Sequence, residues 1–84
     1  MNRKQRKTLE ALFDAPVRSD IRWAEIESLF QALGAHVKGT GGSRVRVTLN
    51  GIVAVFHRPH PQPTAYKSLV RYVKMYLERA GVCP

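Results

Sequence analysis

The pair Asn50-Gly51 constrains this chain more than any other feature of its sequence. It stands between two stretches, 44–49 and 52–57, that carry apolar residues at alternate positions facing one another across the pair. Asn-Gly is the preferred pair for a two-residue type I′ turn, because both central residues of that turn need positive φ angles. The sequence therefore predicts a tight antiparallel β-hairpin with Asn50 and Gly51 as its loop.

The two-residue loop also predicts which side chains share each face of the hairpin. One face is apolar and suits a core: Leu49 opposite Ile52, Val47 opposite Ala54, and Val45 opposite Phe56. The other face mixes cations with apolar groups: Thr48 opposite Val53, Arg46 opposite Val55, and Arg44 opposite His57. We therefore expect a sheet with one buried side and one open, basic side.

Net charge narrows the function classes. The 84 residues include 14 Lys and Arg but only 6 Asp and Glu, which gives a formal net charge of +8. The hydrophobic fraction of 44% is enough for one small folded domain, so the charge does not indicate disorder. A folded domain this basic is typical of proteins that bind a polyanion such as RNA, DNA or an acidic protein. The alternative is a basic soluble protein with no such ligand.

Cysteine usage and hydropathy predict a protein of the reducing, cytoplasmic compartment without a Cys/His metal site. Cys83 is the only cysteine, so neither an intrachain disulfide nor a Cys/His zinc spacing can form. No apolar run is long enough to cross a membrane, and the basic start is not followed by the apolar core of a signal peptide.

The remaining segments predict helices on either side of the strands. Helical spacing of apolar residues covers 20–33 and ends at Gly34, and a last helix follows Thr64 as its N-cap and ends at Gly81. Its predicted apolar face comprises Tyr66, Leu69, Val70, Val73, Tyr76, Leu77 and Ala80.

Between these helices we expect a short edge strand at 35–38, a flexible glycine-rich connector at 39–42, and an extended proline-rich loop at 57–63. Residues 3–13 are a candidate short helix. In the alternative, Arg3, Lys4, Arg6 and Lys7 form a frayed, solvated tail that adds non-specific affinity for phosphates.

These elements predict an α+β fold of α-β-β-β-α order, similar to double-stranded-RNA-binding domains. A three-stranded antiparallel sheet would carry its helices on one face. We expect residues 1–18 to be a basic N-terminal extension and residues 19–84 to form the domain. The fold by itself implies no function.

Four short motifs along residues 20–82 occur in the order and spacing of a known family. They are Leu33-Gly34 at a helix end, Gly42-Ser43 at a strand start, the run Phe56 to Pro61, and Ala80-Gly81-Val82. Together they resemble one branch of the HicA toxins of prokaryotic toxin–antitoxin pairs. The resemblance implies an mRNA interferase that is neutralised by an acidic HicB-type antitoxin encoded beside it.

The chain departs from the family pattern at one position. In HicA toxins a catalytic histidine usually follows Gly-Ser or Gly-Thr, whereas here Arg44 follows Gly42-Ser43. Arginine keeps a positive charge for RNA binding but does not exchange a proton near neutral pH. General acid–base catalysis therefore needs another residue.

Three histidines are candidates for this role. His57 would lie directly across from Arg44 on the open face, where it could act as a base. His60, held between two prolines, could face the same cleft, and His36 is the weakest candidate. For each the alternative is structural or solvated: His57 as the end of a strand, His60 as an exposed loop residue.

The predicted nucleic-acid-binding residues are Lys38, Ser43, Arg44, Arg46 and Arg58. The main hypothesis is a toxin that is monomeric when free and cleaves mRNA without metal or cofactor, with an acidic antitoxin covering its open face. The alternative is a non-catalytic RNA- or antitoxin-binding module. A DNA-binding domain is a weaker third hypothesis, because no helix-turn-helix pair is evident.

Overall fold

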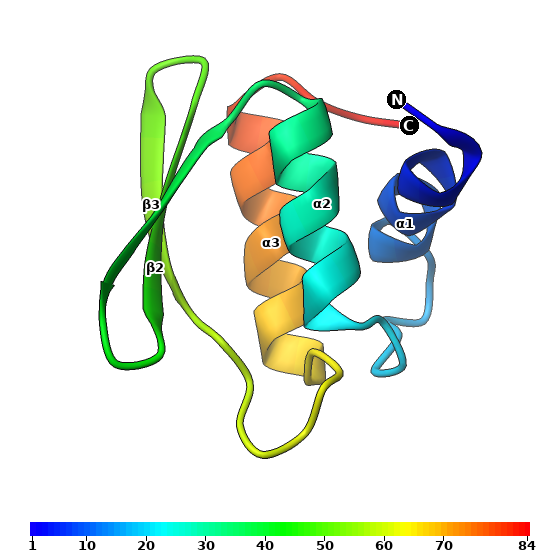
Figure 1. Ribbon diagram of the computed structural model, residues 1–84. Coiled ribbons are helices and arrows are strands. Elements are labelled where there is room, and N and C mark those ends of the chain that lie inside the picture. The colour runs from blue at the N-terminus through cyan, green and yellow to red at the C-terminus, as the bar shows by residue number, and fades with distance from the viewer.

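The computed structural model describes residues 1–84 as three helices and one sheet (Figure 1). The elements in chain order are α1 (Arg3–Leu12), α2 (Trp23–Ala32), β1 (His36–Gly41), β2 (Arg44–Leu49), β3 (Ile52–His57) and α3 (Lys67–Arg79). This is the predicted α+β fold in α-β-β-β-α order, with α1 added in front. None of the helices is long and apolar enough to span a membrane.

The β2–β3 hairpin has the predicted register at all six cross-strand pairs, from Leu49 opposite Ile52 to Arg44 opposite His57. Asn50 and Gly51 have φ angles of 51° and 79°, as a type I′ turn requires. The Asn50 side chain has a second role, because its Nδ2 donates a hydrogen bond of 2.7 Å to the carbonyl of Ala80 just after α3. The turn is thereby attached to the last helix.

The predicted connector at 39–42 is wrong in its extent. β1 runs to Gly41 and pairs antiparallel with β2, in a sheet of order β1-β2-β3. A register shift lies between Gly39 and Gly41, so the glycines accommodate a bulge inside the strand. The turn itself is Gly42-Ser43, where Gly42 has a φ of 56°. Hydrogen bonding to β2 extends a segment whose own composition favours a loop.

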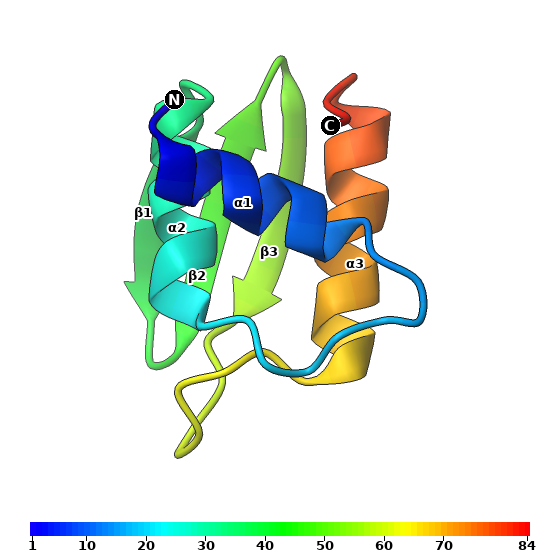
Figure 2. The same cartoon turned by 90° about the vertical axis from the view of Figure 1, so that its right-hand side faces the viewer.

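The helices all lie on one side of the sheet. In Figure 1 the sheet is seen edge-on with α2 and α3 beside it, and Figure 2 shows α1 crossing in front of both. The core of 19 buried residues fills the space between these layers. Its centre is aromatic: Phe56 of β3 lies with its ring centroid 5.6 Å from those of Phe30 in α2 and Tyr76 in α3.

The N-terminal segment forms a helix that belongs to the same core, so the frayed-tail alternative is wrong. A capping box starts α1, in which the Asn2 side chain accepts from the Gln5 backbone and the Gln5 side chain accepts from the Asn2 backbone. Leu9 and Leu12 are buried. The predicted boundary after residue 18 stays a prediction, and α1 packs against α2 and α3 across it.

The start of α3 differs from the prediction. The helix begins at Lys67, Thr64 does not cap it, and Tyr66 is 52% exposed instead of lying on the apolar face. Thr64 instead forms an isolated antiparallel bridge with Arg22. Flanking hydrogen bonds join Trp23 N to the Pro63 carbonyl at 2.9 Å and Ala65 N to the Ile21 carbonyl at 2.7 Å.

This bridge holds both segments extended. It explains why α2 begins at Trp23 and α3 at Lys67, later than the apolar spacing predicts.

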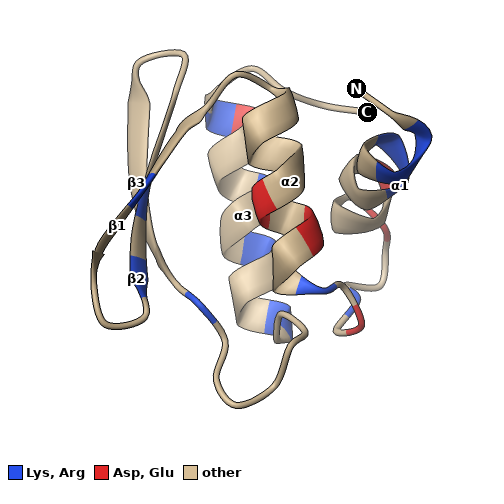
Figure 3. Ribbon diagram, in the orientation of Figure 1, with Lys and Arg blue, Asp and Glu red and all other residues tan.

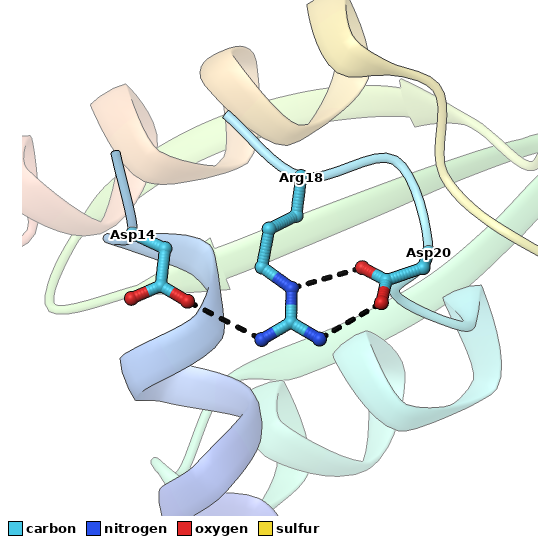
Figure 4. A network of polar contacts seen from close by, with 3 residues as sticks. All are labelled: Asp14, Arg18 and Asp20. Carbon is cyan, nitrogen blue, oxygen red and sulfur yellow. Dashed lines mark hydrogen bonds and ion pairs between the residues drawn. The ribbon is translucent and has the colours of Figure 1, made fainter. Parts of the chain in front are cut away.

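An exposed ion-pair cluster closes the loop between α1 and α2 (Figure 4). The Arg18 guanidinium donates to both oxygens of Asp20, each at 2.9 Å, and to Asp14 at 3.2 Å. The hydrogen bond from Arg18 lowers the pKa of Asp20. Two of the six acidic residues are thus engaged on the helical side of the molecule.

Candidate nucleic-acid interface

The side of the sheet that faces away from the helices carries most of the predicted site residues. We call it the outer face. The register places its residues in three rows across β1, β2 and β3: His36–Thr48–Val53, Lys38–Arg46–Val55, and Gly41–Arg44–His57. All except Thr48 are exposed. The fold therefore gathers Lys38, Arg44, Arg46 and His57 on one surface. The hairpin predicted the shared face of Arg44, Arg46 and His57, and the pairing of β1 with β2 adds Lys38.

Arg44 and His57 form one of the close pairs of the hairpin. The Arg58 amide donates to the Ser43 carbonyl at 2.8 Å, so residues 43 and 58 form a hydrogen-bonded pair. In an antiparallel ladder the neighbouring pair is then the non-hydrogen-bonded kind, in which side chains approach most closely, with Cβ atoms ~4.5–5.5 Å apart. An imidazole and a guanidinium can therefore contact one phosphodiester together.

Acidic residues are absent from this part of the chain. Between residues 28 and 77 there is no Asp or Glu, while seven cations occur there: Lys38, Arg44, Arg46, Arg58, Lys67, Arg71 and Lys74. Figure 3 shows the strands with basic positions only and the acidic positions on the helices and their connections. The sheet and most of α3 therefore carry positive charge with no acidic residue in the same segment, which favours binding of an anionic ligand.

Two apolar side chains interrupt the cations of the outer face. Val53 and Val55 are 45% and 41% exposed. Val55 lies directly opposite Arg46, and Val53 lies opposite Thr48. A surface that combines exposed valines with arginines suits an interface with a macromolecule better than permanent contact with water.

A family model described as the HicA toxin of bacterial toxin–antitoxin systems matches residues 23–82. The chain belongs to the HicA toxin family. The match includes α2, the whole sheet and α3, and it leaves α1 outside. No curated protein and no solved structure matches the chain.

In this HicA protein Arg58 is separated from the other predicted RNA-binding residues. Its guanidinium Nε donates to Glu27 of α2 at 2.7 Å, and Glu27 also accepts from the indole of Trp23. The hydrogen bond with Glu27, followed by its charge, raises the pKa of Arg58. Arg58 therefore joins the end of β3 to α2 and is not a free cation of the outer face.

His60 also lies apart from the outer face of the HicA sheet. It lines a shallow hollow of about 370 Å³ together with Ser19, Pro59, Gln62, Thr64 and Tyr66. Neither Arg44 nor His57 lines this hollow, so the structure does not bring the two candidate catalytic histidines into one pocket. Ser43 lies in the turn beside Arg44, where its carbonyl is bonded to the Arg58 amide.

Glu27 and Trp23 are the residues that sequence reasoning missed. Their spacing of four places both on one side of α2, which is a signal for their mutual contact. Nothing local pairs them with Arg58, which is 31 residues away from Glu27. Only the packing of α2 beside the end of β3 shows the link.

Proposed function

We propose that this HicA toxin binds mRNA on its outer face and cleaves it without a metal ion, with His57 as the general base. The observation that carries the proposal is the close Arg44–His57 pair at one end of a basic, acid-free sheet surface. Both groups are exposed and can therefore reach a bound strand.

The chemistry requires a base, a cation and a nucleophile that RNA itself supplies. The neutral imidazole of His57 takes the proton from a ribose 2′-OH, and the 2′ oxygen attacks the adjacent phosphorus. The bond from phosphorus to the 5′ oxygen breaks, and that oxygen takes a proton from water. The hydroxide left behind takes the proton held by His57, which restores the neutral imidazole. Arg44 stabilises the charge that develops on the phosphate. The products are a 2′,3′-cyclic phosphate and a 5′-OH.

The neighbouring row supplies binding energy. Lys38 and Arg46 are directly opposite one another on β1 and β2, one row away from Arg44. Because neutralised phosphates release counterions, affinity for RNA should fall steeply as salt rises. Affinity that is absent or independent of salt would refute RNA binding at this surface.

The second part of the proposal concerns the partner. We infer that an acidic HicB-type antitoxin covers the outer face and blocks the site. Val53 and Val55 would form the apolar contacts and the arginines the charged ones. Changing both Val53 and Arg46 to Glu should abolish the complex while leaving the fold intact, since both side chains are exposed.

A non-catalytic module remains a second candidate, and Arg44 is the observation that favours it. It stands where the family pattern has a catalytic histidine, so the substitution fits a HicA fold that keeps binding and has lost cleavage.

Induction of the chain in a bacterial host separates the two candidates. We expect the parent to stop growth and His57→Ala to relieve it, with 2′,3′-cyclic phosphate ends on cleaved RNA in the parent alone. Toxicity that persists in His57→Ala but disappears in His60→Ala would move the base to His60. An inert parent that gains activity as Arg44→His would identify the binding module, whose catalytic residue has been replaced.

A further inference from the structure

β3 is a free edge of the sheet with an unused row of backbone groups. It pairs only with β2. In the ladder that follows a two-residue loop, Ile52, Ala54 and Phe56 bond to β2, so the N–H and C=O groups of the residues between them point away from the sheet. Those residues are Val53, Val55 and His57. None of them takes part in a hydrogen bond outside the ladder.

The two edges of the sheet differ in their protection. β1 contains glycines, a bulge and Lys38, all of which discourage pairing with another strand. The sequence of β3, from Ile52 to His57, has no glycine, proline, lysine, arginine or acidic residue, and its pairing with β2 shows no bulge. The β3 edge is therefore suited to accept a further strand, and the β1 edge is not.

α3 lies beside the β3 edge and presents two exposed, largely apolar side chains, those of Tyr72 and Met75. In Figure 2 the strands run β1, β2, β3 from left to right, and α3 lies to the right of β3. Tyr72 of α3 places its ring centroid 4.9 Å from that of Phe56 yet is 44% exposed, and Met75, one turn later, is 59% exposed. Lys74 points to the other flank of the helix, over Phe13. Tyr72 thus lies on the flank nearest β3, and Met75, three residues further along, is its neighbour on the surface of the helix.

The positive charge of the sheet favours an acidic partner strand at the β3 edge. The three strands contain no acidic residue, and Arg46 lies directly opposite Val55 on the outer face. A second copy of the chain would bring a further charge of +8 against this surface. An acidic segment would be attracted to it.

We propose that the β3 edge accepts an extended acidic segment of a protein partner as a fourth strand. Its alternate apolar side chains would pack under Tyr72 and Met75, and its acidic side chains would lie on the outer face. Because the added strand would run beside His57, it would also close the candidate site. The identity of the partner as an antitoxin rests on the proposed function, whereas the strand addition rests on the edge itself.

NMR titration of the ¹⁵N-labelled full chain tests the edge without RNA or toxicity. The probe is an octapeptide of alternating Glu and Val, and its matched control alternates Lys and Val. We expect the Glu-Val peptide to shift the amides of Val53, Val55 and His57 and to slow their hydrogen exchange. Equal binding of the Lys-Val peptide, or shifts without slowed exchange at these amides, would overturn the proposal.

Two variants of Val55 separate backbone pairing from side-chain contact. Val55→Pro removes an outward N–H and no bond to β2, so we expect about tenfold weaker peptide binding. Val55→Thr keeps the N–H and should change affinity by no more than about twofold. Gly39→Pro, which removes an outward N–H of β1, should leave peptide binding unchanged.

If peptide binding is weaker in Val55→Thr but unchanged in Val55→Pro, the contact lies on the outer face and strand addition is refuted. If Val55→Pro fails to fold, the exchange measurement on the parent still decides. A concentration-dependent dimer that protects the same amides would assign the edge to a second copy and contradict the acidic segment. None of these readouts depends on RNA cleavage, so each proposal can fail alone.

Discussion

The two faces of the β2–β3 hairpin come from the same six cross-strand pairs, yet they have opposite environments. On the inner face Val45, Val47 and Phe56 are at most 1% exposed. On the outer face their immediate neighbours along the chain, Arg44, Arg46 and Val55, are exposed. The inner face sets stability through packing, and the outer face is free to carry charge and chemistry. Changes on one face should therefore leave the property of the other largely intact.

The sharpest test of this comparison uses two adjacent residues of β3. Phe56→Ala removes a ring packed against Phe30 and Tyr76 and should lower the free energy of unfolding by about 3–5 kcal/mol. Val55→Ala, on the outer face, should cost only about 0.5 kcal/mol. Urea unfolding measures both. Similar losses for the two variants would show that the outer face is also part of the core.

The converse effect is expected for His57. His57→Ala should slow RNA cleavage by about 10²–10⁴-fold, which is the usual contribution of a general base. Urea unfolding should be almost unchanged, because the side chain is exposed. The rate of cleavage of a short RNA measures the effect. The matched histidine is His36, on the same face but in the most distant row. An equal loss in His36→Ala would contradict a specific role for His57.

A smaller effect is expected from the binding cations. Arg46→Ala should weaken RNA binding for all sequences and reduce the slope of log affinity against log salt by about one. Arg18→Ala is the control on the helical side, where the guanidinium is engaged by Asp14 and Asp20. Fluorescence anisotropy at several salt concentrations measures the slopes. If the two variants reduce the slope alike, RNA is not confined to the outer face.

The smallest effect concerns pH and the inner face. Burial raises the pKa of Tyr76, whose hydroxyl donates to the Ile52 carbonyl at 2.8 Å. The unfolded chain therefore releases this proton first, and the free energy of unfolding should fall as pH rises above about 10. Tyr76→Phe should flatten that decline. Tyr72→Phe, at an exposed tyrosine, should retain it. A decline that persists unchanged in Tyr76→Phe would assign it to other groups.

Local patterns in the sequence predicted the elements whose geometry depends on neighbours along the chain. Asn50-Gly51 needs positive φ at both positions, and that one requirement fixed the register of β2 with β3 and the face on which each side chain lies. The outer-face placement of Arg44, Arg46 and His57 followed directly.

Where the prediction was wrong, a long-range contact outweighed a local preference. β1 extends through glycines to Gly41 because β2 provides hydrogen-bonding partners, and α3 starts late because Thr64 is bridged to Arg22. The N-terminal segment, open between helix and tail, is a helix whose Leu9 and Leu12 are buried in the common core.

The candidate site shows the same division. Alternation along a strand determined by itself that Arg44 and His57 would be neighbours, because a hairpin with a two-residue loop has only one register. Tertiary packing alone decided that Arg58 is held by Glu27 of α2, that His60 lies in a separate hollow, and that α3 overhangs a free β3 edge. Each of these depends on how helices that are distant in sequence pack on the sheet. The spacing of residues along the chain does not reveal which side chains that packing brings together.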